Sequence, residues 1–216
     1  MVIGGRRTEL LDRLAAEHPG LHTVVIDTSD AASTAAAAEE VMRRFPRTDV
    51  LVPMAGIMLP EDLHSPDFLP TAEATIATNL LGPVRLIAHF TPFLAGQDAA
   101  VIMTVSSGLA FVPLPATPTC NATKAAVHSF TESLRVQLAD TGIQVVELVP
   151  PAVRTPLMGQ RDDERAMPLP DSLDEALALI ERDPRITEVL VERVTPLRHA
   201  EADGSYARVL AALSRH

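Results

Sequence analysis

Cys120 and Lys124 stand four residues apart on a segment that the sequence pattern predicts to be helical. Residues at this spacing share one face of a helix, so a thiol and an amine lie about one turn apart. A neighbouring lysine and a helix N-terminus lower the pKa of a thiol and favour the nucleophilic thiolate. A lone cysteine is also often a small, inert apolar residue. The pair is therefore consistent with either a reactive thiol or an inert one at Cys120. Ser107 stands thirteen residues before Cys120, at the end of an apolar run.

Further polar residues stand where they can take part in chemistry. Asn79 lies in the middle of a predicted helix, where asparagine is a poor helix former, and this favours a functional role. His64 follows the Ala55-Gly56 loop and is a candidate base, while Arg154 is a candidate ligand for a carboxylate or a phosphate. Ser107 has no G-x-S-x-G motif around it, which weighs against a hydrolase triad. No spacing of His, Cys, Asp and Glu resembles a metal site.

The segments that carry these residues alternate between strands and helices. Their short, almost continuously apolar strands are typical of a parallel sheet that is buried on both faces, so the sequence predicts an α/β fold. Residues 150–170 are expected to form a loop outside the carboxyl ends of the strands, where open α/β sheets bind ligands. The expected strands span residues 2–5, 22–27, 50–52, 99–105 and 143–149, and the expected helices span residues 8–17, 71–94, 118–138, 172–182 and 200–213, with one more from a cap at Ser29 or Asp30 to residues 45–46.

Length and composition restrict the classes of protein. The chain has 216 residues, of which 47% are hydrophobic, and this suits a single domain over residues 1–216. Its formal net charge of −10 weighs against nucleic-acid and anionic-membrane partners. No apolar run is long enough to span a bilayer, and the first residues lack the layout of a signal peptide. The single cysteine rules out an internal disulfide, so we expect a cytoplasmic protein.

Several motifs together resemble those of the short-chain dehydrogenase/reductase family. They are Thr104-Val105-Ser106-Ser107-Gly108, Lys124, Ala77-Thr78-Asn79-Leu80-Leu81 and Ala55-Gly56-Ile57. The run from Ser106 to Ala126, the pair Pro150-Pro151 and the segment Val191-Glu192-Arg193-Val194 are similar, more narrowly, to the bacterial DltE-like branch. The resemblance extends from Val2 to Leu213. It is specific for the fold and much less specific for the function.

The resemblance implies a hydride-transfer site and assigns a role to each of its polar residues. Ser107 would orient a substrate carbonyl, Lys124 would bind the nicotinamide ribose, and Asn79 would hold a proton-relay water. Cys120 stands at the position of the family's catalytic tyrosine and departs from the pattern. A thiol is shorter than a phenol, so both the reach and the bulk of the proton donor change, and a pocket opens where the ring would stand.

On the cofactor side the resemblance is incomplete. Arg6, Asp27, Ala55-Gly56 and Thr155 match family positions around NADP(H). The family's first strand and Gly-rich turn, which cradle the pyrophosphate, have no counterpart here, and Pro53-Met54 stand in place of two asparagines. We therefore expect no cofactor, or NADP(H) if one is bound. The substrate side is expected to include Met54, His64, Val153 and Arg154.

The implied fold is a Rossmann-like, doubly wound parallel sheet that lacks the first strand and its Gly-rich turn. The first strand is central in such a sheet, so its loss leaves two strand edges unpaired. Three arrangements are open: the flanking strands pair directly, another chain donates a strand, or the working protein begins upstream of Met1.

Three functional classes are consistent with these residues. The first is a cofactor-independent, non-redox enzyme that uses Ser107, Asn79 and Lys124 to polarise a small carbonyl substrate for cyclisation, dehydration or isomerisation, as in biosynthetic tailoring. The second is an inactive subunit that pairs with an active homologue, and the third is an NADP(H)-dependent oxidoreductase. The predicted helices 71–94 and 120–138 are apolar over more than one face, so we expect a homodimer, or a heterodimer with a related subunit.

Overall fold

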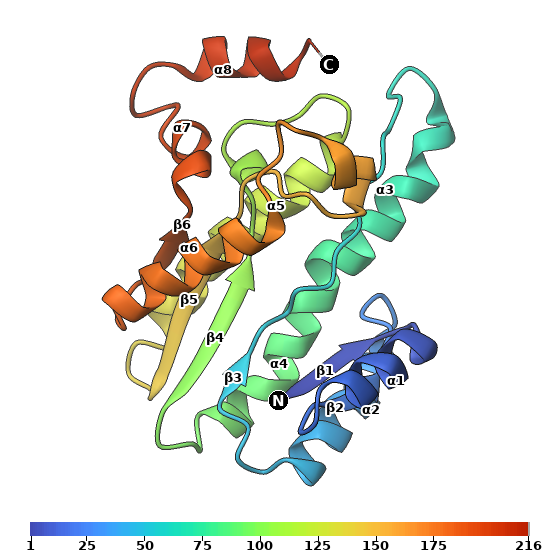
Figure 1. Ribbon diagram of the computed structural model, residues 1–216, viewed down its shortest axis with the longest axis vertical. Helices are drawn as coiled ribbons and strands as arrows, with labels where there is room; N and C mark the ends of the chain where they lie inside the picture. The colour runs from blue at the N-terminus through green and yellow to red at the C-terminus, as the bar shows by residue number, and fades with distance from the viewer. Residues whose placement is uncertain (216) are drawn as a thin grey trace.

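The computed structural model describes residues 1–215, and strands and helices alternate along most of this length (Figure 1). A π-helical turn, Ala77–Leu81, joins α3 (Leu69–Ile76) to α4 (Gly82–Leu94). The order of elements confirms the predicted α/β fold. The strands are β1 (Val2–Gly5), β2 (His22–Val25), β3 (Val50–Leu51), β4 (Ala100–Val105), β5 (Ile143–Val149) and β6 (Glu188–Leu190). The helices are α1 (Thr8–Glu17), α2 (Ala31–Arg44), α3 (Leu69–Ile76), α4 (Gly82–Leu94), α5 (Pro118–Gln137), α6 (Leu169–Arg182), α7 (Thr195–Arg198) and α8 (Tyr206–Leu213).

The helix boundaries follow from capping and from residues that cannot continue a helix. The Asp30 carboxylate accepts a hydrogen bond from the amide of Ser33 and caps α2, which confirms one of the two predicted caps. Pro118 begins α5, at a position where an N–H would have no intrahelical acceptor, so the missing N–H of proline costs no hydrogen bond. Gly20 turns the chain after α1 with a φ of +87°, a conformation that favours glycine. No helix in the described residues has the length and the apolar character that crossing a membrane requires.

The strands form two separate parallel sheets. β1 pairs with β2, and the order β3-β4-β5-β6 makes the second sheet. No ladder joins β1 to β3 within residues 1–215, so the first of the three arrangements considered, direct pairing of the flanking strands, is wrong. The two sheets are instead held by side chains that pack beneath a shared layer of helices.

Two apolar clusters cover opposite faces of the four-stranded sheet. Residues of β4 alternate between them, because successive side chains of a strand point to opposite faces. α6 covers one face and lies across β4 and β5 in Figure 1, so the helices flank the sheet on both sides. The cluster that also reaches β2 contains Val24, Ile26, Ala37, Ala38, Val41, Ile87, Phe90, Leu94, Ala100, Ile102, Ile143 and Val145. The cluster under α6 contains Val146, Met167, Ala176, Val189 and Val191.

The C-terminal part differs from the sequence prediction. Glu188–Leu190 forms strand β6, which was not predicted because three residues are too few for a periodic signal. α6 begins earlier than expected, at Leu169, and the closing helix α8 begins later, at Tyr206. The predicted helix 71–94 contains the π-helical turn around Asn79, a feature that often marks a functional position.

Replacement of a core leucine tests whether the shared helix layer stabilises the fold. Leu94 is fully buried at the end of α4, whereas Leu177 on α6 is 57% exposed. We expect Leu94→Ala to lower the free energy of unfolding by about 2–5 kcal/mol, since it removes buried methyl groups and leaves a cavity. The control Leu177→Ala should change it by less than about 0.5 kcal/mol. Urea unfolding followed by circular dichroism measures both, and equal losses would contradict the assignment of the core.

Candidate functional site

Ser107 lies at the carboxyl end of β4, at the start of the turn that leads toward α5. Its hydroxyl oxygen accepts a hydrogen bond from the amide of Leu109, at 3.2 Å. The turn is pressed against the segment before α7, because a Cβ at Gly108 would lie 2.7 Å from a methyl group of Val194. The Gly108 amide also donates to the Pro150 carbonyl, in the loop after β5. The loops after two neighbouring strands therefore fix the Ser107 backbone.

Lys124 is the only lysine of the chain, and α5 directs its amine to the end of β4. Its Nζ donates a hydrogen bond to the Val105 carbonyl at 2.8 Å, two residues before Ser107. Burial lowers the pKa of the Lys124 amine, and the neighbouring Cys120 opposes this shift less strongly. The lowered pKa enlarges the neutral fraction of the amine, which is the form that accepts a proton.

Cys120 is buried and holds its thiol in the protonated form. Burial raises the pKa of the thiol, Lys124 counteracts this, and the negative charge of Glu61 raises it further. The Asn79 Nδ2 lies 3.7 Å from the Sγ atom as a hydrogen-bond donor. The thiolate is therefore disfavoured, because desolvation outweighs the effect of the Lys124 charge.

Asn79 connects the π-helical turn to the loop after β3. Its Oδ1 accepts from the Ile57 amide and its Nδ2 donates to the Ile57 carbonyl, both at 2.8 Å. The residue is 1% exposed, and Gly56 packs close to it, since a Cβ there would lie 3.4 Å from Oδ1. The amide thus positions the Ala55-Gly56 loop beside Cys120.

Glu61 also belongs to this site, although it was not predicted from the sequence. Its Oε2 accepts a hydrogen bond from the amide of Thr119 in the first turn of α5, at 2.8 Å. Its Oε1 is buried and has no hydrogen-bond partner within the described part of the chain. A carboxylate at a helix N-terminus is favourable because it satisfies a free amide. Glu61 and Thr119 are 58 residues apart, so no local pattern could reveal the contact.

The residues expected on the adenosine side lie on the two-stranded sheet. Arg6 follows β1 and its guanidinium lies 3.8 Å from the Asp27 carboxylate. The hydroxyl and the amide of Ser29 both donate to Asp27, and these bonds, with a smaller effect of Arg6, lower the pKa of this carboxyl group. The structure therefore brings Arg6 and Asp27 together, apart from the four-stranded sheet that carries Ser107.

The residues expected on the substrate side contact their own loops or solvent in the structure. The Arg154 guanidinium donates to backbone carbonyls of its own loop, those of Asp163, Glu164 and Ala166. The His64 ring is almost fully exposed and bonds to Asp62. Met54 is 62% exposed, Val153 forms a bridge with Met167, and the Thr155 hydroxyl accepts from the Leu157 amide at 3.4 Å.

The sequence of most of this chain matches a known protein family. The family model described as short chain dehydrogenase matches residues 1–166. The chain belongs to the short-chain dehydrogenase family. The curated relatives of this family member include "Uncharacterized oxidoreductase DltE" of Bacillus subtilis, 38% identical over 168 residues that make up 77% of this chain and 67% of that protein. "Sulfoacetaldehyde reductase 2" of Chromohalobacter salexigens is 32% identical over 160 residues, which are 72% of this chain and 63% of that one.

Solved structures confirm the short-chain dehydrogenase fold. A 3-ketoacyl-(acyl-carrier-protein) reductase from Brucella melitensis, complexed with NADH, superposes with a TM-score of 0.75 at 30% identity and covers 89% of this chain and 87% of its own. A short chain dehydrogenase from Burkholderia cenocepacia, in complex with NADP, has a TM-score of 0.77 at 26% identity over 97% of this chain and 84% of its own. The chain spans about two thirds of the length of the curated relatives that it matches.

The pH dependence of alkylation tests the state of Cys120. Iodoacetamide reacts with the thiolate, so we expect the rate of modification to rise with a midpoint above the ordinary thiol pKa of 9.0. Lys124→Met should raise the midpoint further, because it removes a positive charge, and Glu61→Gln should lower it, because it removes a negative one. Mass spectrometry follows the single adduct, with free N-acetylcysteine as the control. Shifts of the same sign in both variants would contradict this electrostatic account.

Proposed function

We propose that this protein is a carbonyl-binding enzyme that moves protons, without hydride transfer, on a short-chain dehydrogenase scaffold. The observation that carries the proposal is the partly buried Lys124 amine, which is bonded to the Val105 carbonyl and has a lowered pKa, next to a Cys120 thiol whose pKa is raised. Such an amine is suited to general acid–base catalysis. Cyclisation, dehydration and isomerisation of a small carbonyl compound are the reaction types that need this chemistry.

The contacts of Ser107 and Lys124 suggest how such a reaction proceeds. Because the Ser107 oxygen accepts from the Leu109 amide, its hydroxyl proton can be donated to the substrate carbonyl oxygen. The neutral Lys124 amine takes a proton from the carbon beside the carbonyl, and the electron pair of the C–H bond forms the enolate, whose charge rests on the oxygen held by Ser107. Return of the proton to another carbon gives an isomer. Loss of a hydroxide from the next carbon, with this proton, gives water and an unsaturated product.

Cys120 stands at the position of the family's catalytic tyrosine, and its properties argue against a role as the proton donor. The thiol is short, buried and bonded by Asn79, and its pKa is raised. Asn79 itself acts as a positioning residue, because its amide is engaged with the backbone of Ile57. The acid–base function therefore falls to Lys124 in this proposal.

An NADP(H)-dependent oxidoreductase is the second candidate, and the Arg6–Asp27 pair favours it. Several relatives are named oxidoreductases, and the two solved structures contain NADH and NADP. On this alternative Arg6 would hold a 2′-phosphate and Asp27 the adenine, which suits an exposed guanidinium beside a carboxylate. The cofactor would supply hydride. The described residues offer no Gly-rich turn for its pyrophosphate, so only the adenosine side is matched.

Hydrogen–deuterium exchange at carbon separates the two candidates. We expect the protein, without cofactor, to catalyse α-proton exchange of probe ketones such as cyclohexanone and ethyl acetoacetate in D₂O, read by proton NMR. Lys124→Met should slow the catalysed exchange by a factor of about 10²–10⁴, because it removes the base. Ser107→Ala should slow it as well, since the enolate oxygen loses its donor.

The exposed serine of α5 provides the control for this assay. Ser133→Ala lies on the same helix as Lys124 and should leave the exchange rate unchanged. Exchange that persists in Lys124→Met would refute the proton-transfer mechanism. Consumption of NADPH with these ketones, by the unmodified protein, would establish the oxidoreductase instead.

We further propose that two copies of the chain associate through α3 and α5. Leu63, Phe68, Ile76 and Leu80 form an apolar hollow against the first turns of α5. Leu63 is 58% exposed and Ile76 is 40% exposed, and both line the same apolar hollow rather than standing alone on the surface. A second copy would remove this apolar area from water.

A charge in the hollow tests the dimer. Light scattering coupled to size exclusion should give a dimer mass for the unmodified protein and a monomer mass for Ile76→Glu, because burial of an unpaired carboxylate at an interface is unfavourable. Leu177→Glu, at an exposed leucine of α6, is the matched control and should remain dimeric. A monomer mass for the unmodified protein at micromolar concentration would contradict the proposal.

A further inference from the structure

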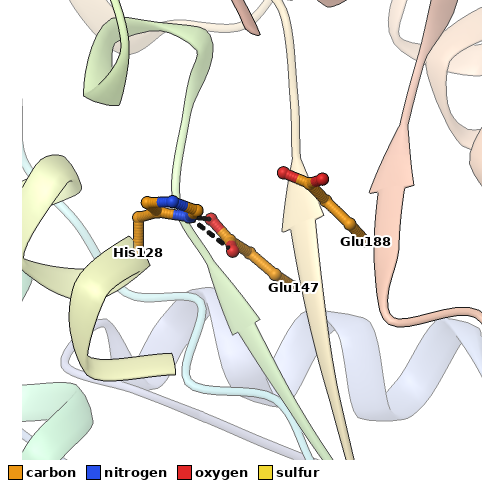
Figure 2. Close-up of side chains that lie close together, drawn as sticks. All are labelled: His128, Glu147 and Glu188. Atoms are coloured by element: carbon orange, nitrogen blue, oxygen red, sulfur yellow. Dashed lines mark hydrogen bonds and ion pairs between the residues drawn. The ribbon is translucent and has the colours of Figure 1, made fainter. Parts of the chain in front are cut away.

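His128, Glu147 and Glu188 lie together although they belong to three different elements, α5, β5 and β6 (Figure 2). Each offers a ligand atom, and these atoms lie within 4.8 Å of one another. The His128 Nδ1 is 2.8 Å from one carboxylate oxygen of Glu147 and 3.0 Å from the other. Glu147 and Glu188 are partners in the parallel register, so both side chains project from the same face of the sheet.

Two carboxylates thus face each other where little water can screen them. Glu147 is 1% exposed and the Glu188 side chain is 23% exposed. Like charges opposite each other on neighbouring strands are destabilising, and a low dielectric strengthens the repulsion. Arg198 balances one charge, with its Nε 2.6 Å from Glu188 Oε1. The His128 ring is the hydrogen-bond partner of the Glu147 carboxylate.

The donor types in this cluster match a divalent metal ion of intermediate softness. Imidazole nitrogen and carboxylate oxygen are both common zinc ligands, whereas calcium and magnesium prefer oxygen alone. We propose that His128, Glu147 and Glu188 form a Zn²⁺-binding site. Bonds of about 2.1 Å require ligand atoms about 3.4 Å apart in a tetrahedron, so the side chains must close in by rotation about their own bonds.

The surroundings of the cluster suit an outer shell for the ion. Arg198 bonds one oxygen of Glu188 and leaves the other for the metal, and carboxylate ligands are commonly held in this way. The Phe111 ring packs edge-on against His128 at 4.8 Å, while the Arg198 guanidinium lies 4.5 Å above the same ring. Phe111 belongs to the turn that begins at Ser107. An ion at this site would therefore cross-link α5, β5 and β6 and stabilise the turn that begins at Ser107.

The sequence spacing could not reveal this site. His128 and Glu147 are 19 residues apart, and Glu188 lies on a strand that the sequence pattern did not predict. No spacing of His, Cys, Asp and Glu along the chain accordingly resembles a metal site. Parallel pairing of β5 with β6, together with the packing of α5 on the sheet, produces the cluster.

Titration calorimetry tests the site directly. After treatment with a chelator and its removal, the unmodified protein should bind one Zn²⁺ per chain from ZnCl₂. His128→Gln and Glu188→Gln should each weaken the affinity at least about tenfold, since each removes a direct ligand. Co²⁺ provides an independent readout, because its visible absorption depends on the type and number of its ligands. We expect the unmodified protein to give the absorption of Co²⁺ with few nitrogen and oxygen ligands. Both variants should lose this absorption.

An exposed histidine–carboxylate pair provides the matched control. His64 Nδ1 lies 2.7 Å from Asp62, much as in the cluster, but both side chains are exposed. His64→Gln should keep the affinity of the unmodified protein. Circular dichroism checks folding, and Glu188→Gln, which preserves size at a partly exposed position, serves as the test should His128→Gln fail to fold. Absence of Zn²⁺ binding, or binding that survives in Glu188→Gln, would overturn the proposal.

Discussion

Apolar packing, rather than strand pairing, holds the two sheets of this protein side by side. Val24 and Ile26 at the two-stranded sheet share one buried cluster with Ile87 of α4 and Ile102 of β4. The hydrophobic effect is non-directional, so it can join sheets whose backbones share no ladder. As a result, the two groups of family positions are separated: Arg6 lies with the small sheet, while Ser107 lies at the end of the large one.

Burial also determines the chemistry of the candidate site. The same loss of water raises the pKa of the Cys120 thiol and lowers that of the Lys124 amine, so both groups move toward their neutral forms. In the function that we propose, Lys124 therefore transfers the proton in place of the family's phenol. Two further residues fix the segments around the site. Asn79 bonds to the Ile57 backbone, and Glu61 bonds to the first turn of α5.

Residue patterns predicted those features that depend on neighbours in the chain. The Asp30 cap, the start of α5 at Pro118 and the strand that ends before Ser107 all follow from local chemistry. Features that depend on distant partners were missed or left open. Local residues left both a reactive and an inert thiol open at Cys120, whereas burial by the rest of the fold raises the pKa of the thiol and favours its protonated form. Likewise, β6 is too short to be recognised before its pairing with β5 is known.

The sequence by itself determined the fold class and the family, because alternating apolar segments and short motifs are properties of consecutive residues. It also marked Ser107, Asn79, Cys120 and Lys124 as residues of interest. Only the tertiary structure decided which strand edges pair, in which direction the pKa values of Cys120 and Lys124 shift, and which carboxylates meet, as Glu147 and Glu188 do across β5 and β6. Desolvation and long-range contact decide these properties, and both arise only when the elements pack together.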